Sequence, residues 1–227
     1  TSIFTYQPRE STIDFEGHLS LLMFTKGCNF RCGYCHNPEL IPETEDTMTF
    51  EELKDILKFA KDNWIDAISI TGGEPTMNNN LVETLRFVKN NGFLIKLDTQ
   101  GSFPNILEDA LPYLDYVAMD YKMPLDDLIS LIHADIDTES IKKSLVLLKN
   151  SNKKYEIRTT VVPGVHTKET MTKICKEIGN VDKYVLQPFV PRDNIPDKKL
   201  RTVGRTSKLI LDDYFALCSK YISNVSV

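Results

Sequence analysis

The sequence lacks any apolar stretch that approaches the roughly 20 residues needed to span a bilayer. Its longest uncharged candidate, Leu19 to Thr25, has only the length of a strand. The N-terminus also lacks a basic segment followed by an apolar one, which is the pattern of a secretory signal. These absences predict a cytoplasmic protein that has no membrane partner.

The sequence also lacks an excess of positive charge. The chain has 27 Lys and Arg residues against 32 Asp and Glu residues, which gives a formal net charge of −5. Non-specific nucleic-acid binding needs a positive surface, so the balance predicts no nucleic-acid partner. One local cluster of cations is either a solvated loop or a basic patch, and it consists of Lys198, Lys199, Arg201, Arg205 and Lys208.

The cysteines are few and odd in number, which argues against a fold stabilised by disulfide bonds. The five are Cys28, Cys32, Cys35, Cys175 and Cys218. The first three form a C-x3-C-x2-C cluster that a random scatter would produce on the order of once in a thousand sequences. Cys175 and Cys218 fall within expected helices and are predicted to be buried core thiols.

Short β-type runs alternate with longer segments of helical periodicity. The expected strands are Leu19–Thr25, Ala67–Thr71, Phe93–Asp98, Tyr116–Asp120, Tyr155–Val161 and Tyr184–Gln187. The expected helices are Thr49–Asn63, Asn80–Asn91, Asn105–Leu114, Asp137–Asn150, Thr167–Ile178 and Thr206–Ile222. Thr49 with Glu52 predicts a capping box at the start of the first helix.

Six alternating units predict a parallel sheet with right-handed crossovers. A full eight-unit barrel takes about 250 residues or more, so the fold class expected here is α/β, a partial (β/α)6 TIM-like barrel. Residues 1–18 are expected to form a short hairpin or extension, and residues 19–227 the core domain. The active site of such a fold forms at the carboxyl ends of the strands.

Each of those strands has a chemistry-bearing residue within it, at its end or in the loop that follows. Three thiolates on one tight loop can hold three irons of a cubane cluster and leave the fourth iron without a protein ligand. A Cys3His zinc site that uses His36, or three reduced structural cysteines, are the alternatives. The other residues at the strand ends are Gly72, Gly73, Glu74, Asp98, Thr99, Asp120, Lys122 and Gln187, and Arg158 lies within the expected strand Tyr155–Val161.

The cysteine loop, with an aromatic residue before its third cysteine, resembles the radical S-adenosylmethionine (SAM) superfamily. The resemblance implies a 4Fe–4S cluster on Cys28, Cys32 and Cys35, with SAM bound at the fourth iron. Tyr34 would pack near the adenine, and His36 would contact the base. One electron from the cluster would cleave SAM to methionine and a 5′-deoxyadenosyl radical, which needs shielding from water.

The segment Gly72-Gly73-Glu74-Pro75 resembles the second motif of that family. The two glycines would let the backbone approach the methionyl group of SAM. Glu74 would accept a hydrogen bond from the SAM amine. The alternative is a plain strand-to-helix turn.

Two further segments resemble the D-T-N-G and D-x-K motifs of glycyl-radical-enzyme activating enzymes. They imply that Asp98, Thr99 and Asp120 hold a monovalent cation, Na⁺ or K⁺, beside the SAM carboxylate. Two neighbouring carboxylates repel each other unless a cation lies between them. Lys122 would contact SAM or its ribose side. The alternative is exposed carboxylates, one of them paired with Lys122.

Two later segments extend the resemblance along nearly the whole chain. Arg158, like Lys122 a candidate catalytic residue, would orient carboxylates inside the barrel or form a structural salt bridge. Gln187-Pro188-Phe189 stands where some activating enzymes carry a histidine near SAM, and Gln187 is therefore a candidate SAM contact. This pattern resembles the activating proteins of anaerobic ribonucleoside-triphosphate reductases.

The function that the resemblance implies is abstraction of a glycine hydrogen from a partner glycyl radical enzyme. That partner would be an anaerobic ribonucleotide reductase or a pyruvate formate-lyase-like enzyme. A flavodoxin or ferredoxin would supply electrons, and Pro188–Arg205 is a candidate docking surface. The alternatives are a radical SAM enzyme that modifies a small molecule, peptide or RNA, and a non-catalytic metal-binding interaction module.

Overall fold

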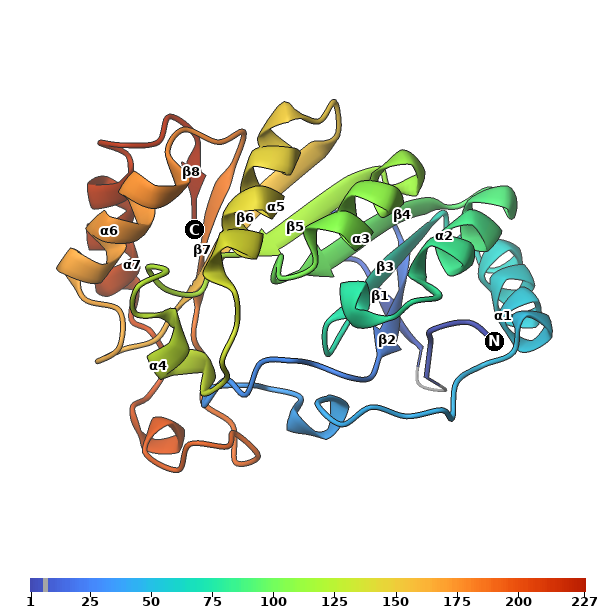
Figure 1. The fold of residues 1–227 in the computed structure, drawn as a ribbon, viewed down its shortest axis with the longest axis horizontal. Helices are drawn as coiled ribbons and strands as arrows, with labels where there is room; N and C mark the ends of the chain where they lie inside the picture. The colour runs from blue at the N-terminus through green and yellow to red at the C-terminus, as the bar shows by residue number, and fades with distance from the viewer. Residues whose placement is uncertain (6–7) are drawn as a thin grey trace.

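The computed structural model describes residues 1–5 and 8–227, whose strands form one sheet (Figure 1). The order of the strands across the sheet is their order along the chain. β1 runs antiparallel to β2, and each later pair is parallel. The strands are β1 (Arg9–Ser11), β2 (Ser20–Thr25), β3 (Ala67–Gly72), β4 (Leu94–Thr99), β5 (Tyr116–Asp120), β6 (Lys154–Val161), β7 (Tyr184–Pro188) and β8 (Val225–Ser226).

Helices connect the parallel strands, and Figure 1 shows them ranged along the sheet from α1 at one end to α6 and α7 at the other. They are α1 (Phe50–Asp62), α2 (Leu81–Asn90), α3 (Pro104–Ala110), α4 (Leu128–Ile132), α5 (Thr138–Asn150), α6 (Lys168–Ile178) and α7 (Lys208–Cys218). Single 3-10 turns occur at Pro38–Leu40, Pro75–Met77, Leu111–Tyr113 and Leu200–Thr202. The β2–β7 strands with their helices confirm the partial (β/α)6 barrel.

The two faces of the sheet differ in chemistry. One face carries the apolar residues that form the core, among them Leu21, Met23, Ile68, Ile70, Ile95, Leu97, Val117, Met119 and Ile157. The strand register places polar residues together on the opposite face, including Ser69, Lys96, Asp98, Asp120, Glu156, Arg158 and Thr160. Because side chains alternate along a strand, one face packs against helices while the other lines a polar barrel interior.

The capping box predicted for the first helix is present. The amide of Glu52 donates to Thr49 Oγ1 at 3.2 Å, and the amide of Thr49 donates to Glu52 Oε2 at 2.8 Å. These bonds satisfy donors that the first helical turn leaves open, so α1 begins at Phe50.

Four elements differ from the sequence expectations. α3 ends at Ala110 and continues only as a 3-10 turn, because Pro112 has no amide hydrogen for the next helical bond. α7 is shorter than expected and starts at Lys208, since the Ser207 side chain caps it by accepting from the amide of Ile210. The short helix α4 and the two-residue strand β8 were not expected.

The extension expected over residues 1–18 contributes β1, whose partner is the first core strand, β2. Residues 6 and 7 of that extension lie outside the described residues. Ile3 and Phe4 are buried, and the amide of Met48 donates to the carbonyl of Phe4 at 2.9 Å. Within the described part of the chain, no helix has the length and apolarity to cross a membrane.

Candidate active site

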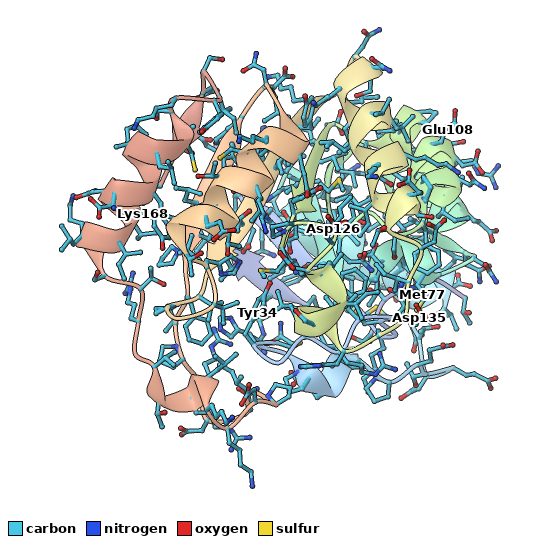
Figure 2. All side chains as sticks on the ribbon, turned by 60° about the vertical axis from the view of Figure 1, so that its left-hand side comes forward. Tyr34, Met77, Glu108, Asp126, Asp135 and Lys168 are labelled. Atoms are coloured by element: carbon cyan, nitrogen blue, oxygen red, sulfur yellow. The ribbon has the colours of Figure 1, made fainter. Side chains whose placement is uncertain are left out.

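A cavity of about 220 Å³ opens at the carboxyl ends of β2, β3, β4, β5 and β6. The loops after these strands gather along one edge of the molecule, where Figure 2 shows Tyr34 between the sheet and the loops beneath it. The lining includes Cys28, Cys32, Tyr34, Cys35, His36, Gly72, Gly73, Glu74, Asp98, Thr99, Asp120, Lys122 and Arg158. Every residue in that list is a predicted site residue.

The three clustered cysteines carry free thiols that face this cavity. Burial raises the pKa of the Cys28 thiol to about 11 and that of Cys32 to about 12, and it also raises the pKa of Cys35. Binding iron as thiolates would therefore release protons from all three side chains. Within residues 1–5 and 8–227, no group of three His, Cys, Asp or Glu side chains is placed to bind a single metal ion. A cubane cluster does not require such a group, because each of its thiolate ligands binds a different iron.

The two glycines after β3 permit a close approach between two loops. A Cβ on Gly72 would lie 2.2 Å from the carbonyl oxygen of Thr25, and one on Gly73 would lie 2.1 Å from that of Gly27. Gly72 also has a φ of +132°, which favours glycine. The glycines thus let the β3 turn meet the chain that leads into the cysteine loop, a role that the sequence did not reveal.

The buried carboxylate of Glu74 joins the ends of β3 and β4. Thr99 Oγ1 donates to Glu74 Oε1 at 2.6 Å, and the amide of Gln100 donates to Oε2 at 2.8 Å. Thr76 donates to Oε1 through its amide, at 3.0 Å, and through its hydroxyl. Burial raises the pKa of Glu74, although these donors oppose the rise. Because Oε2 has one donor, it retains a lone pair for a further hydrogen bond.

Tyr34 and His36 lie on opposite sides of Cys35 and have different surroundings. The Tyr34 hydroxyl is buried and has no hydrogen-bond partner among the described residues. Lys122 Nζ lies 5.7 Å from the centroid of the Tyr34 ring. His36 Nε2 bonds the carbonyl of Val190 at 2.8 Å, and its ring stacks on Phe189 at 6.0 Å. The segment after β7 therefore packs directly against the cysteine loop.

Arg158 lies between the carboxylates of Asp98 and Asp120. Its Nε donates to Asp120 Oδ1 at 2.9 Å, and its Nη2 is 3.4 Å from Asp98 Oδ2. Lys122 Nζ is 3.1 Å from Asp120 Oδ2, and Lys96 Nζ is 3.5 Å from Asp98 Oδ1. The guanidinium offsets the repulsion between the two carboxylates, and the monovalent cation expected at Asp98, Thr99 and Asp120 stays a prediction.

The electrostatics of Asp120 follow from these neighbours. Burial by itself would raise its pKa, but Arg158 and Lys122 hold the pKa at about 2. Burial likewise would lower the pKa of Lys122, but the nearby Asp120 raises it well above its ordinary value. Both side chains therefore remain charged across the neutral range and can present a fixed ion pair to a ligand.

One predicted residue does not line the cavity, and Asn29, which bonds a residue of the lining, was not predicted to belong to the site. Gln187, on β7, pairs in register with Thr160 but does not line the cavity. Asn29 Oδ1 accepts from Gln100 Nε2 at 2.7 Å, which ties the cysteine loop to the end of β4. The only sequence signal for Asn29 is its place between two cysteines.

Comparisons with known proteins agree with this geometry. Residues 22–178 match the profile of the Radical SAM superfamily. A protein of Methanocaldococcus jannaschii that carries the name glycyl-radical enzyme activating enzyme is 34% identical over 96% of this chain and 92% of its own length. The pyruvate formate-lyase 1-activating enzyme of Escherichia coli K12 is 29% identical over 78% of this chain and 76% of its own length.

Solved structures share the fold at low sequence identity. A structure of TYW1 with a lysine-pyruvate adduct has a TM-score of 0.65 at 16% identity, over 88% of this chain and 73% of that one. A domain of the pyruvate-formate lyase-activating enzyme from Bacteroides vulgatus has a TM-score of 0.56 at 14% identity, over 71% of this chain and 98% of that one.

Proposed function

This chain belongs to the radical SAM superfamily, whose members use a 4Fe–4S cluster and SAM, and from that we propose that it activates a glycyl radical enzyme. The observation that carries the proposal is the meeting of Cys28, Cys32 and Cys35 with Glu74 and Lys122 in one cavity. The relatives that match along most of the chain carry the name of activating enzymes.

The residues fit such a cofactor in three respects. Three free thiols on one loop provide the ligands of three irons and leave one iron for SAM. The buried Tyr34 hydroxyl has no partner among the described residues and can bond a ligand. The open lone pair on Glu74 Oε2 suits an ammonium group.

When bound and reduced by one electron, the cluster with SAM would supply radical chemistry able to remove a hydrogen atom from glycine. The protein's own residues bind and enclose that chemistry. Cys28, Cys32 and Cys35 hold the cluster, and Glu74 orients the amine of SAM. Lys122, fixed by Asp120, offers an ammonium group to the SAM carboxylate or ribose, while Arg158 bridges the carboxylates of Asp98 and Asp120.

The partner, the electron source and the compartment belong to the same proposal. The names of the relatives favour a glycyl radical enzyme as substrate. A one-electron donor such as a flavodoxin or ferredoxin fits the reductive cleavage of SAM. A cytoplasmic location fits the free thiols, which need a reducing compartment.

The test is an anaerobic assay of the reconstituted, reduced protein with SAM. We expect 5′-deoxyadenosine from the wild type, none from Cys32→Ala, and wild-type yield from Cys175→Ala, which changes a core thiol. Pyruvate formate-lyase and an anaerobic ribonucleotide reductase are then added separately, and a glycyl radical is sought by electron paramagnetic resonance. Absence of the cluster refutes the proposal, and 5′-deoxyadenosine without a radical on either protein refutes activation of these two partners.

A further inference from the structure

A buried histidine outside the cavity lining contacts the loop that carries Lys122. His166 follows β6 and is 3% exposed. Its Nδ1 accepts a hydrogen bond from the amide of Val162 at 2.9 Å, and its Nε2 lies 2.8 Å from the carbonyl oxygen of Lys122. Because Nδ1 is an acceptor, the ring proton is on Nε2 and is donated to the Lys122 carbonyl.

Hydrogen bonds from its own turn and from α7 fix the backbone of His166. The amide of His166 donates to the carbonyl of Val162 at 3.0 Å, and the Tyr214 hydroxyl donates to the carbonyl of His166 at 2.6 Å. Burial lowers the pKa of His166, which favours the neutral ring. A protonated ring would direct a second N–H at the amide hydrogen of Val162.

β5 ends at Asp120, so the loop that follows needs hydrogen bonds from outside the sheet to fix its backbone. Thr159 Oγ1 donates to the carbonyl of Tyr121 at 2.7 Å, and His166 donates to the next carbonyl, that of Lys122. Within the described residues, no other donor bonds the Lys122 carbonyl. Glu177 Oε2 accepts from the Tyr121 hydroxyl at 2.7 Å and from the amide of Leu125 at 3.0 Å, which fixes the ends of the loop but not its centre.

We infer that His166 is a positioning residue for Lys122: by bonding its carbonyl, the neutral ring holds the ammonium group between Asp120 and Tyr34. This inference rests on the proposed function, since it assigns His166 an effect on SAM binding through Lys122. The side chain itself does not line the cavity. Its influence therefore passes through the backbone of one residue.

The variants are chosen to separate this role from general stability. His166→Gln keeps one donor and one acceptor, so it can bond both the Lys122 carbonyl and the Val162 amide. His166→Leu removes both bonds. His133→Asn is the control, because His133 is exposed, its ring makes no hydrogen bond within the described residues, and asparagine tolerates its φ of +48°. Lys122→Met and the His166→Leu/Lys122→Met double variant complete the set.

Dissociation constants for SAM are measured by equilibrium dialysis on the cluster-loaded proteins, together with their iron content. His166→Leu should weaken SAM binding about tenfold at unchanged iron content, the loss typical of one buried hydrogen bond. His166→Gln should stay within about threefold of wild type. The double variant should bind no more weakly than Lys122→Met alone, because His166 acts through Lys122. Wild-type affinity in His166→Leu, or additive losses in the double variant, would overturn the inference.

Nuclear magnetic resonance of the cluster-free protein gives a readout that does not depend on SAM. The His166 nitrogens should show the Nε2–H tautomer, and the Lys122 ε-protons should be shifted by the ring current of Tyr34. That shift should persist in His166→Gln and disappear in His166→Leu. If the wild type binds no SAM, the proposed function fails, and these spectra alone decide whether His166 positions Lys122. An Nδ1–H tautomer, or a shift unaffected in His166→Leu, refutes it.

Discussion

At the residue scale, Gly73 shows how little room separates the β3 turn from the cysteine loop. An added Cβ would lie 2.1 Å from the Gly27 carbonyl oxygen, so Gly73→Ala must displace one of the two loops. We expect a loss of about 3 kcal/mol in the free energy of unfolding, measured by urea denaturation, and a lower iron content after reconstitution.

The control for Gly73→Ala is Gly164→Ala. An added Cβ there meets no atom within 4 Å, although the φ of +79° makes any side chain strained. It should cost only about 1 kcal/mol and leave the iron content unchanged. Equal losses of unfolding free energy and of iron content in both variants would show that the close approach at Gly73 does not contribute to stability or cluster binding.

Glu74 offers a second test at this scale, because every hydrogen-bond partner of its carboxylate is a donor. In Glu74→Gln an amide NH₂ replaces one oxygen and must face a donor, either the Gln100 amide or the Thr groups at Oε1. We expect a loss of about 2 kcal/mol in the free energy of unfolding. A thermal or urea denaturation series that finds the variant as stable as wild type would contradict the buried network.

At the element scale, β4, β5 and β6 all contribute charged residues to a shared ion-pair network. Arg158 on β6 bonds Asp120 of β5 and contacts Asp98 of β4, and its side chain is 11% exposed. Removing the guanidinium leaves two neighbouring carboxylates with only the flanking lysines. The network therefore links the strands through charge as well as through backbone hydrogen bonds.

Replacing Arg158 tests that link. Arg158→Met should lower the free energy of unfolding by about 3 kcal/mol, the cost of breaking a buried ion pair by removing one partner. Arg158→Lys should lose less, because an ammonium group keeps the charge but cannot bridge both carboxylates in the fork geometry of guanidinium. Urea denaturation measures both, and a larger loss in the lysine variant than in the methionine variant would contradict this account.

The sequence predicted the regular elements because each strand is a short apolar or β-branched run between helical segments. It failed where an element is too short to carry a period, as in α4 and β8, and at α3, where Pro112 ends the helix early. Gln187 was expected at the site from the end of its strand, yet a place at a strand end does not bring a side chain to the cavity.

At the scale of the whole molecule, the site combines local motifs with long-range partners. The thiols and Glu74 could be found from sequence because their motifs are contiguous. A carboxylate-binding role for Arg158 was expected, but its particular partners and the contact of His166 with Lys122 could not be predicted, because each joins residues about 40 positions apart or more. Such pairs depend on which strands are neighbours and on which face each side chain lies.

The pH dependence of stability also belongs to this scale. The pKa of Asp120 is about 2 in the folded protein, below its ordinary value, so its ion pairs stabilise the fold above the ordinary pKa. That stabilisation should disappear as the pH falls from about 4 to about 2. Urea denaturation of wild type and Asp120→Asn should give a difference that shrinks over this interval, and a difference that stays constant would contradict the lowered pKa.

The agreement between strand order and chain order has a consequence for synthesis on the ribosome. Each strand after β1 pairs with the one made just before it, so the sheet can grow in the direction of translation. The cysteine loop emerges early, whereas Lys122, Arg158 and His166 follow much later in the chain. A nascent chain thus displays its three thiols before the opposite wall of the pocket exists, and cofactor insertion becomes a late event in the maturation of the protein.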